Sequence, residues 1–89
     1  MYILTNKSNK VLYTGVTSGL VGRVLQHKNG KGSVFTSSYN VNKLVYYEVA
    51  DDILVAIARE KQIKSWKRQK KLDLINNFNS GWRDLTSEI

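Results

Sequence analysis

The chain has 89 residues, of which 42% are hydrophobic, and its 14 Lys and Arg against 7 Asp and Glu give a formal net charge of +7. This length predicts a single domain over residues 1–89 with one modest core, and the lack of cysteine excludes disulfides and thiolate zinc sites. A single histidine also excludes a metal site built on two histidines of one chain, whereas a divalent metal held by carboxylates, phosphate and water stays open.

The excess of positive charge favours a polyanionic partner, and nucleic acid is the commonest. No apolar run approaches the ~20 residues of a membrane-spanning helix, and the N-terminus lacks the pattern of a signal peptide. We therefore expect no membrane partner and a cytoplasmic location.

Two short runs rich in β-branched and aromatic residues, YIL and VLYTGV, open the chain. The turn-forming segment TNKSNK between them predicts a β-hairpin. Loops of several lengths would fit this segment; if Thr5 pairs with Lys10, then Tyr2 lies opposite Tyr13. Facing residues of an antiparallel pair project from the same side of the sheet, so this pairing places the two tyrosine rings side by side.

The segment TSGLVGRVLQHKNG predicts a helix that starts near Leu20 and stops at Gly30. The expected N-cap residue is Thr17 or Ser18. Arg23 and His27 are spaced i,i+4 on this helix and therefore lie on neighbouring positions of its surface. Taken alone, Arg23 is better explained by a solvated helix flank than by phosphate binding, and His27 is better explained by a satisfied interface histidine than by a catalytic one.

The second half of the chain predicts one more strand and two helices. SVFTSSYN is polar and irregular, and KLVYYEV, residues 43–49, is a third strand. The helix that follows begins at Asp51 or Asp52 and breaks near Arg68–Leu72, where the phase of its apolar positions shifts. In the tail, Trp82 and Leu85 are expected to return to the core. The order β-β-α-β-α-α favours an α+β fold with a small antiparallel sheet flanked by helices.

Glu60 is the most informative single residue of the sequence. At 100° per residue it falls within the apolar stripe of its helix, between positions such as Ala56 and Ile63. A carboxylate in such a stripe must be paired, hydrogen-bonded or bound to a cation. Two interpretations are therefore open, a buried ion pair with an Arg or Lys and a metal ligand at the edge of a cleft.

Residues 59–71, REKQIKSWKRQKK, carry seven basic residues and one acid. We call residues 59–71 the basic segment. A solvated helix face is one interpretation of it, and contact with the phosphates of a nucleic acid is the one that we favour. The residues expected to bind nucleic acid are Arg23, Lys61, Lys64, Lys67, Arg68, Lys70 and Lys71.

Together, YIL, LYTGVT, the R and QH of the first helix, AIAREKQIKSWKRQKKLDLI and NSGWRDL resemble the GIY-YIG nuclease superfamily. The chain looks most like its small stand-alone bacterial members, which are related to the N-terminal nuclease module of the excision-repair incision subunit. The resemblance implies a three-stranded antiparallel sheet flanked by helices. It also implies structural positions at Gly15 and Asn79, and catalytic roles for Tyr2, Tyr13, Arg23, His27 and Glu60.

By this resemblance the protein is expected to be a metal-dependent endonuclease acting in DNA repair or recombination. Glu60 would hold one Mg²⁺ or Mn²⁺, Arg23 would stabilise charge on the phosphate, and either Tyr2 or Tyr13 would take the proton of the attacking water. DNA is favoured over RNA, and a protein partner is one source of specificity for so small a chain. The alternatives are a nucleic-acid-binding module with little or no cleavage and an adaptor for an acidic protein.

Overall fold

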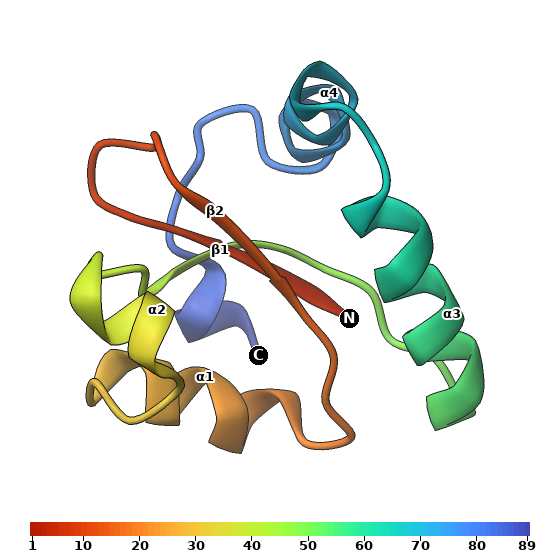
Figure 1. Ribbon diagram of the computed structural model, residues 1–89, viewed down its shortest axis with the longest axis horizontal. Helices are drawn as coiled ribbons and strands as arrows, with labels where there is room; N and C mark the ends of the chain where they lie inside the picture. The colour runs from red at the N-terminus through yellow and green to blue at the C-terminus, as the bar shows by residue number, and fades with distance from the viewer.

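A computed structural model describes residues 1–89 (Figure 1). Its elements, in chain order, are β1 (Tyr2–Thr5), β2 (Leu12–Gly15), α1 (Leu20–Lys28), α2 (Val34–Ser38), β3 (Lys43–Tyr47), α3 (Ile53–Lys64), α4 (Arg68–Phe78) and the 3-10 helix η1 (Leu85–Glu88). None of the helices is long and apolar enough to cross a membrane.

The three strands form one antiparallel sheet in the order β2-β1-β3, which confirms the predicted α+β architecture. The hairpin register differs from the pairing of Thr5 with Lys10, because Tyr2 pairs with Gly15 and Leu4 pairs with Tyr13. That pairing is therefore wrong by two residues. A shift by two keeps every side chain on its face of the sheet, whereas a shift by one would reverse it, so both tyrosines still project from one face.

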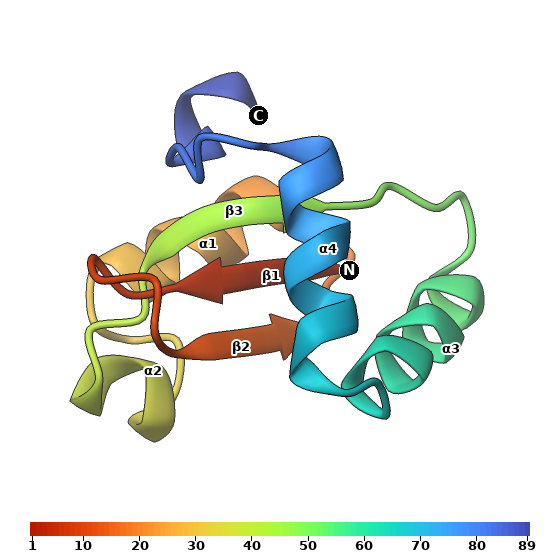
Figure 2. The ribbon, with the colours of Figure 1, turned by 90° about the horizontal axis from the view of Figure 1, so that it is seen from above.

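Helices cover both faces of the sheet, as Figure 2 shows with α4 crossing in front and α1 lying behind. On the α1 side the sheet residues Tyr2, Leu4 and Leu44 pack with Val24 of α1 and Leu85 of η1. The core on the α3–α4 side consists of Met1, Ile3, Val45, Tyr46, Ile63 and Ile75. Alternate residues of β1 thus serve two separate cores, and β1 is buried throughout.

The two ends of helix α1 are set by the backbone conformation of glycine residues and not by capping side chains. Its N-cap is Gly19 and no side chain caps it, so the prediction that Thr17 or Ser18 would do so is wrong. The Thr17 hydroxyl instead accepts a hydrogen bond from the Gly19 amide at 3.0 Å, which forms a turn before the helix. Gly30 lies just past the C-cap with φ +73°, and this left-handed conformation confirms it as the stop.

Residues 34–38, expected to be irregular, form the one-turn helix α2. Ser33 adopts an extended conformation, and its hydroxyl accepts a hydrogen bond from the amide of Thr36 at 3.1 Å. The serines and threonines that indicated a loop therefore act as a cap. One turn is too short for a hydrophobic period to be visible in the sequence.

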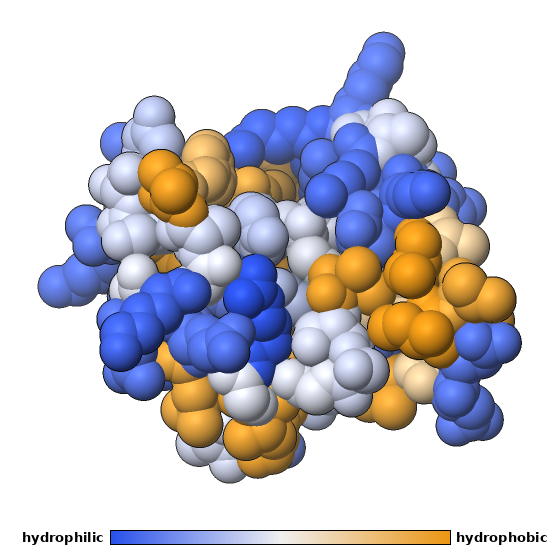
Figure 3. All heavy atoms as spheres, turned by 60° about the horizontal axis from the view of Figure 1, so that its bottom comes forward, coloured by the Kyte–Doolittle hydropathy of each residue, from blue (hydrophilic) through white to orange (hydrophobic).

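Strand β3 confirms the third predicted strand but ends at Tyr47, and Asp52 caps α3 by accepting a hydrogen bond from the Leu54 amide at 2.9 Å. The predicted break between the last two helices lies earlier than Arg68–Leu72, at residues 65–67. The new spacing of the apolar residues can be recognised only after the first turn of the second helix. The sequence therefore places the break a few residues too late. Apolar side chains that are exposed at the start of α3 form the orange area on the right of Figure 3.

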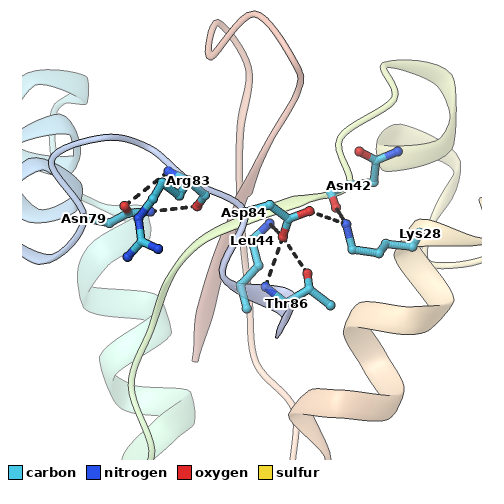
Figure 4. A network of polar contacts seen from close by, with 7 residues as sticks. All are labelled: Lys28, Asn42, Leu44, Asn79, Arg83, Asp84 and Thr86. Carbon is cyan, nitrogen blue, oxygen red and sulfur yellow. Dashed lines mark hydrogen bonds and ion pairs between the residues drawn. The ribbon is translucent and has the colours of Figure 1, made fainter. Parts of the chain in front are cut away.

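The tail after α4 is held against the sheet by two side chains (Figure 4). Asn79 is buried, donates to the carbonyls of Val45 and Arg83, and accepts from the Arg83 amide. Asp84 accepts from Lys28 Nζ at 2.5 Å and from the Thr86 amide at 3.1 Å. As predicted, the tail returns to the core, with Leu85 buried and Trp82 partly buried.

Candidate active site

Three aromatic rings meet on the α1 side of the sheet. The ring centroids of Tyr2 and Tyr13 are 6.3 Å apart, and that of His27 lies 5.7 Å from Tyr2 and 5.4 Å from Tyr13. The strands supply the tyrosines and the third turn of α1 supplies the histidine. The structure thus brings together residues whose proximity the sequence alone did not require.

A chain of hydrogen bonds runs through this cluster. Arg23 Nε donates to the Tyr2 hydroxyl at 3.4 Å, and that hydroxyl lies 3.0 Å from His27 Nε2. On the other side of the ring, His27 Nδ1 lies 3.1 Å from the Thr36 hydroxyl, which is itself 2.9 Å from the Ser33 hydroxyl. Helix α2 therefore completes a network that starts on α1.

The protonation states follow from burial and charge. Burial, followed by the positive charge of Arg23, lowers the pKa of His27, so the imidazole is neutral at pH 7. Burial raises the pKa of Tyr2 although Arg23 opposes this effect, so Tyr2 keeps its proton. A neutral imidazole has one donor and one acceptor. The network is satisfied when Tyr2 donates to Nε2 and Nδ1–H donates to Thr36.

Two glycines make room for these rings. A Cβ on Gly15 would lie 2.4 Å from Cζ of Tyr2, and one on Gly32 would lie 2.0 Å from Nδ1 of His27. Both distances are far below van der Waals contact, so each ring occupies the space of a missing side chain. The structural role expected of Gly15 now has a physical cause. Gly32 was not anticipated, and its only signal is the pair of glycines in GKGS.

Arg23 is held in place on the surface of the cluster. Besides Tyr2, its guanidinium donates to the Gly32 carbonyl and to Gln26 Oε1, both at 2.9 Å. Hydrogen bonding to Tyr2 raises the pKa of Arg23, with a smaller contribution from Tyr13, so its charge faces both tyrosines. A guanidinium has five N–H donors and three are used here. The other two remain for an outside acceptor.

The members of the cluster differ in their access to solvent. Tyr2 is 1% exposed and His27 is 3% exposed, whereas Tyr13 and Arg23 are half-buried. A water or phosphate from outside can therefore reach Tyr13 and Arg23 before it reaches Tyr2. The structure separates two side chains that meet the solvent from two that support them.

Glu60 lies on α3, which stands beside the end of the sheet where β1 begins and β2 ends (Figure 2), and it has no hydrogen bond to the Tyr2–Tyr13–Arg23–His27 cluster. It is 9% exposed, as its place in the apolar stripe predicted, and its Oε1 lies 3.3 Å from Lys64 Nζ. Burial lowers the pKa of the Met1 amino group, and the charges of Glu48 and then Glu60 oppose this effect. Glu60 is thus near Met1, the residue that precedes Tyr2 at the start of β1.

The surroundings of Glu60 fit one kind of metal site only. No group of three or more His, Asp or Glu side chains is arranged to hold a metal ion. Mg²⁺ commonly takes one or two carboxylates and completes its shell with water and substrate phosphate. Lys64 has a side chain that is 54% exposed, so it can turn away from Glu60. The residues therefore fit an ion held by one carboxylate and not a cage made by the protein alone.

A cavity of about 670 Å³ opens at the end of the sheet where β1 begins. Its walls include Met1, the Thr17–Ser18 turn before α1 and Ala56 of α3, one turn before Glu60. Neither Glu60 nor the aromatic cluster lines the cavity, so it adjoins the predicted site residues without containing them.

The basic segment lies at the corner between α3 and α4, in the other helical layer from Arg23. Its basic side chains are exposed apart from Arg59 and Lys71, which are half-buried. Lys70 Nζ lies 4.3 Å from the Trp66 ring centroid, and Arg68 donates to the Lys10 carbonyl. The structure therefore does not gather these residues around the Tyr2–Tyr13–Arg23–His27 cluster. Asn79, also predicted from sequence, is a structural residue of the tail.

The similarity to known proteins extends over most of the chain. The model of the GIY-YIG catalytic domain matches residues 1–73. The chain is similar to a UPF0213 protein of Staphylococcus saprophyticus, with 40% identity over 76 residues, 85% of this chain and 92% of the relative. A UPF0213 protein of Syntrophus aciditrophicus is 42% identical over 76 residues, 84% of this chain and 86% of the relative. No solved structure matches the chain.

Proposed function

The chain belongs to the GIY-YIG family, and on that basis we propose that it is a divalent-metal-dependent endonuclease that hydrolyses phosphodiester bonds in nucleic acid, with DNA favoured over RNA. The observation that carries the proposal is the cluster in which Arg23 faces two tyrosines while two of its N–H donors stay free. Guanidinium N–H donors beside tyrosine hydroxyl groups suit a phosphodiester group.

In this proposal Arg23 binds the scissile phosphate and stabilises the charge that develops on it. Tyr13 is the tyrosine that contacts the attacking water and takes its proton, because Tyr2 is enclosed. Tyr2 and His27 are positioning residues that hold Arg23 and the Tyr13 ring in place. Mg²⁺ or Mn²⁺, held by Glu60 with water and phosphate, would supply Lewis-acid stabilisation of the phosphate and the leaving oxygen.

The proposal predicts that Glu60→Ala abolishes cleavage and spares binding. Labelled single-stranded, duplex, nicked and branched DNA would be incubated with Mg²⁺ or Mn²⁺, with EDTA as a parallel control. Glu88→Ala is the matched control, since Glu88 is an exposed glutamate in the tail whose only ion pair is with Arg83. Cutting that is lost with Glu60→Ala and in EDTA, but kept by Glu88→Ala, supports the assignment. Cutting by Glu60→Ala at the wild-type rate would contradict it.

A second function is favoured by one specific observation, the ion pair between Glu60 and Lys64. If that pair is permanent, Glu60 holds no metal and the basic segment makes the protein a nucleic-acid-binding module. Its signature would be affinity that falls steeply with salt concentration and is unchanged by Mg²⁺. Binding to all four substrates with no metal-dependent product would establish this alternative.

A further inference from the structure

Helix α2 and its C-cap residue, Tyr39, carry two aromatic side chains that extend the ring cluster outward. Phe35 and Tyr39 are spaced i,i+4, and their ring centroids are 5.0 Å apart. The Phe35 ring stacks on Tyr13, with centroids 6.3 Å apart and an angle of 26° between the planes. An unbroken series of rings thus leads from the enclosed Tyr2 through Tyr13 to the surface of α2.

The outer rings of this series are open to solvent. Phe35 is 44% exposed and Tyr39 is 56% exposed, and no other element covers them. Single exposed apolar residues are common on protein surfaces. Two exposed rings that continue directly from Tyr13 are a different case, because they border the surface at which Arg23 leaves two donors free.

Beside α2 lies a polar hollow of about 430 Å³. Besides Gly30 and Val34, it is lined by Lys31, Ser33, Ser37 and Ser38. One ammonium group and several hydroxyls suit a sugar–phosphate chain, which carries one negative charge per nucleotide and many hydrogen-bond acceptors. One short helix therefore combines exposed ring faces with a basic, hydroxyl-lined surface.

From this combination we propose that α2 is a base-stacking subsite, on which Phe35 and Tyr39 bind the unpaired bases of a single-stranded segment next to the scissile phosphate. The inference rests on the proposed function, since it assumes a nucleic-acid substrate at the cluster, and it specifies the substrate class as a single strand or a single-stranded arm. In a continuous duplex the faces of the bases are covered by their neighbours. Only unpaired bases can stack on aromatic side chains, and such stacking tolerates any base sequence.

The test measures binding in EDTA, so that it does not depend on cleavage. Three labelled 12-nucleotide probes are compared: a single strand, a hairpin duplex, and an abasic strand that keeps the sugar–phosphate chain without bases. The variants are Phe35→Leu/Tyr39→Leu, which keeps apolar volume and removes the rings, and Phe35→Trp, which keeps a ring. Leu54→Ala is the control, because Leu54 is an apolar residue of α3 that is even more exposed, at 69%.

The wild type is expected to bind the single strand about 5-fold to 150-fold more tightly than the abasic strand, the range for loss of stacking on one base. The double leucine variant should bind both strands alike, while F35W and L54A keep the wild-type ratio. A double variant that keeps that ratio would overturn the proposal, as would equal wild-type affinity for both strands. The ratio is read only from variants that unfold thermally in one transition, with each single leucine variant as a substitute for the double one.

Other outcomes separate this inference from the proposed function. Metal-dependent cleavage without any base dependence of binding would overturn the subsite and leave the nuclease standing. Base-dependent binding without cleavage would overturn the nuclease and leave the base-stacking subsite standing. If no probe binds and none of the DNA substrates is cut with Mg²⁺ or Mn²⁺, both proposals fail, and the exposed rings would then point to a protein partner.

Discussion

The two helical layers of this protein hold their predicted functional residues in different ways. On the α1–α2 side, Tyr2, Arg23 and His27 are fixed by successive hydrogen bonds and by rings that fill the space above two glycines. On the α3–α4 side, Glu60 has one ion pair, and its partner Lys64 is largely exposed. The first layer is organised before any substrate arrives, whereas the second can rearrange around a ligand. Substitutions should therefore have large effects on stability in the first layer and small effects on stability in the second.

The largest effect is expected from Gly32→Ala. The new Cβ would overlap the His27 ring, and forcing extra volume into such a site costs typically about 1–3 kcal/mol. The ring must move, so the contacts of Tyr2 and Arg23 are disturbed and the proposed cleavage should fall together with stability. Urea unfolding followed by circular dichroism measures the loss.

Gly22→Ala is the matched control, because a Cβ there meets nothing within 4 Å and Gly22 lies inside α1. Alanine in a helix interior is about 1 kcal/mol more favourable than glycine, so this variant should be stabilised. Equal losses for the two alanine variants would contradict the tight packing assigned to Gly32.

A smaller effect is expected from pH, through His27. The pKa of His27 in the folded protein is below its ordinary value, so the unfolded chain binds more protons than the folded one between the two values. Stability therefore rises with pH through this window, and it is lost as pH falls from about 7, past the unfolded pKa near 6.5, toward the lower folded pKa. Unfolding free energies measured from pH 7.5 to 5 test this sign.

His27→Gln removes the titrating group and is the control for this pH dependence. Its stability should be flatter over the same range, because only the Met1 amino group, whose pKa is also lowered by burial, still titrates there in the same direction. The carboxylates with lowered pKa, Glu48 and Asp84, act only at more acidic pH. The nitrogen chemical shifts of the wild-type ring report the tautomer directly and should show the proton on Nδ1. A proton on Nε2 would refute the hydrogen-bond direction assigned here.

The smallest effect is expected from Lys64→Ala in the second layer. The Lys64 end of its pair with Glu60 is exposed, and exposed i,i+4 ion pairs contribute about 0.3–0.5 kcal/mol, so this variant should unfold almost like the wild type. Lys61→Ala, on the same helix and without an ion pair, is the reference. A loss of more than about 2 kcal/mol for Lys64→Ala would be typical of breaking a buried pair. Glu60 would then be a structural residue, and the metal site would lose its support.

Much of the fold could be predicted because its signals are local. The hairpin, α1, the third strand and α3 each carry a period or a cap, as Asp52 and Gly30 illustrate. Helix α2 could not be predicted, because one turn has no period and its capping serine also suits a loop. The hairpin register needed the loop geometry, yet the shared face of Tyr2 and Tyr13 survived an error of two residues.

The sequence by itself determined that Glu60 is buried, since the 100° step of a helix places it among apolar residues whatever the helix packs against. It also determined which residues belong to the family pattern. Only the tertiary structure decided that Tyr2 is enclosed and Tyr13 accessible, that Gly32 and Thr36 support His27, and that the basic segment lies in the other layer. Those properties depend on contacts between segments far apart in the chain, and no local pattern of residues encodes such contacts.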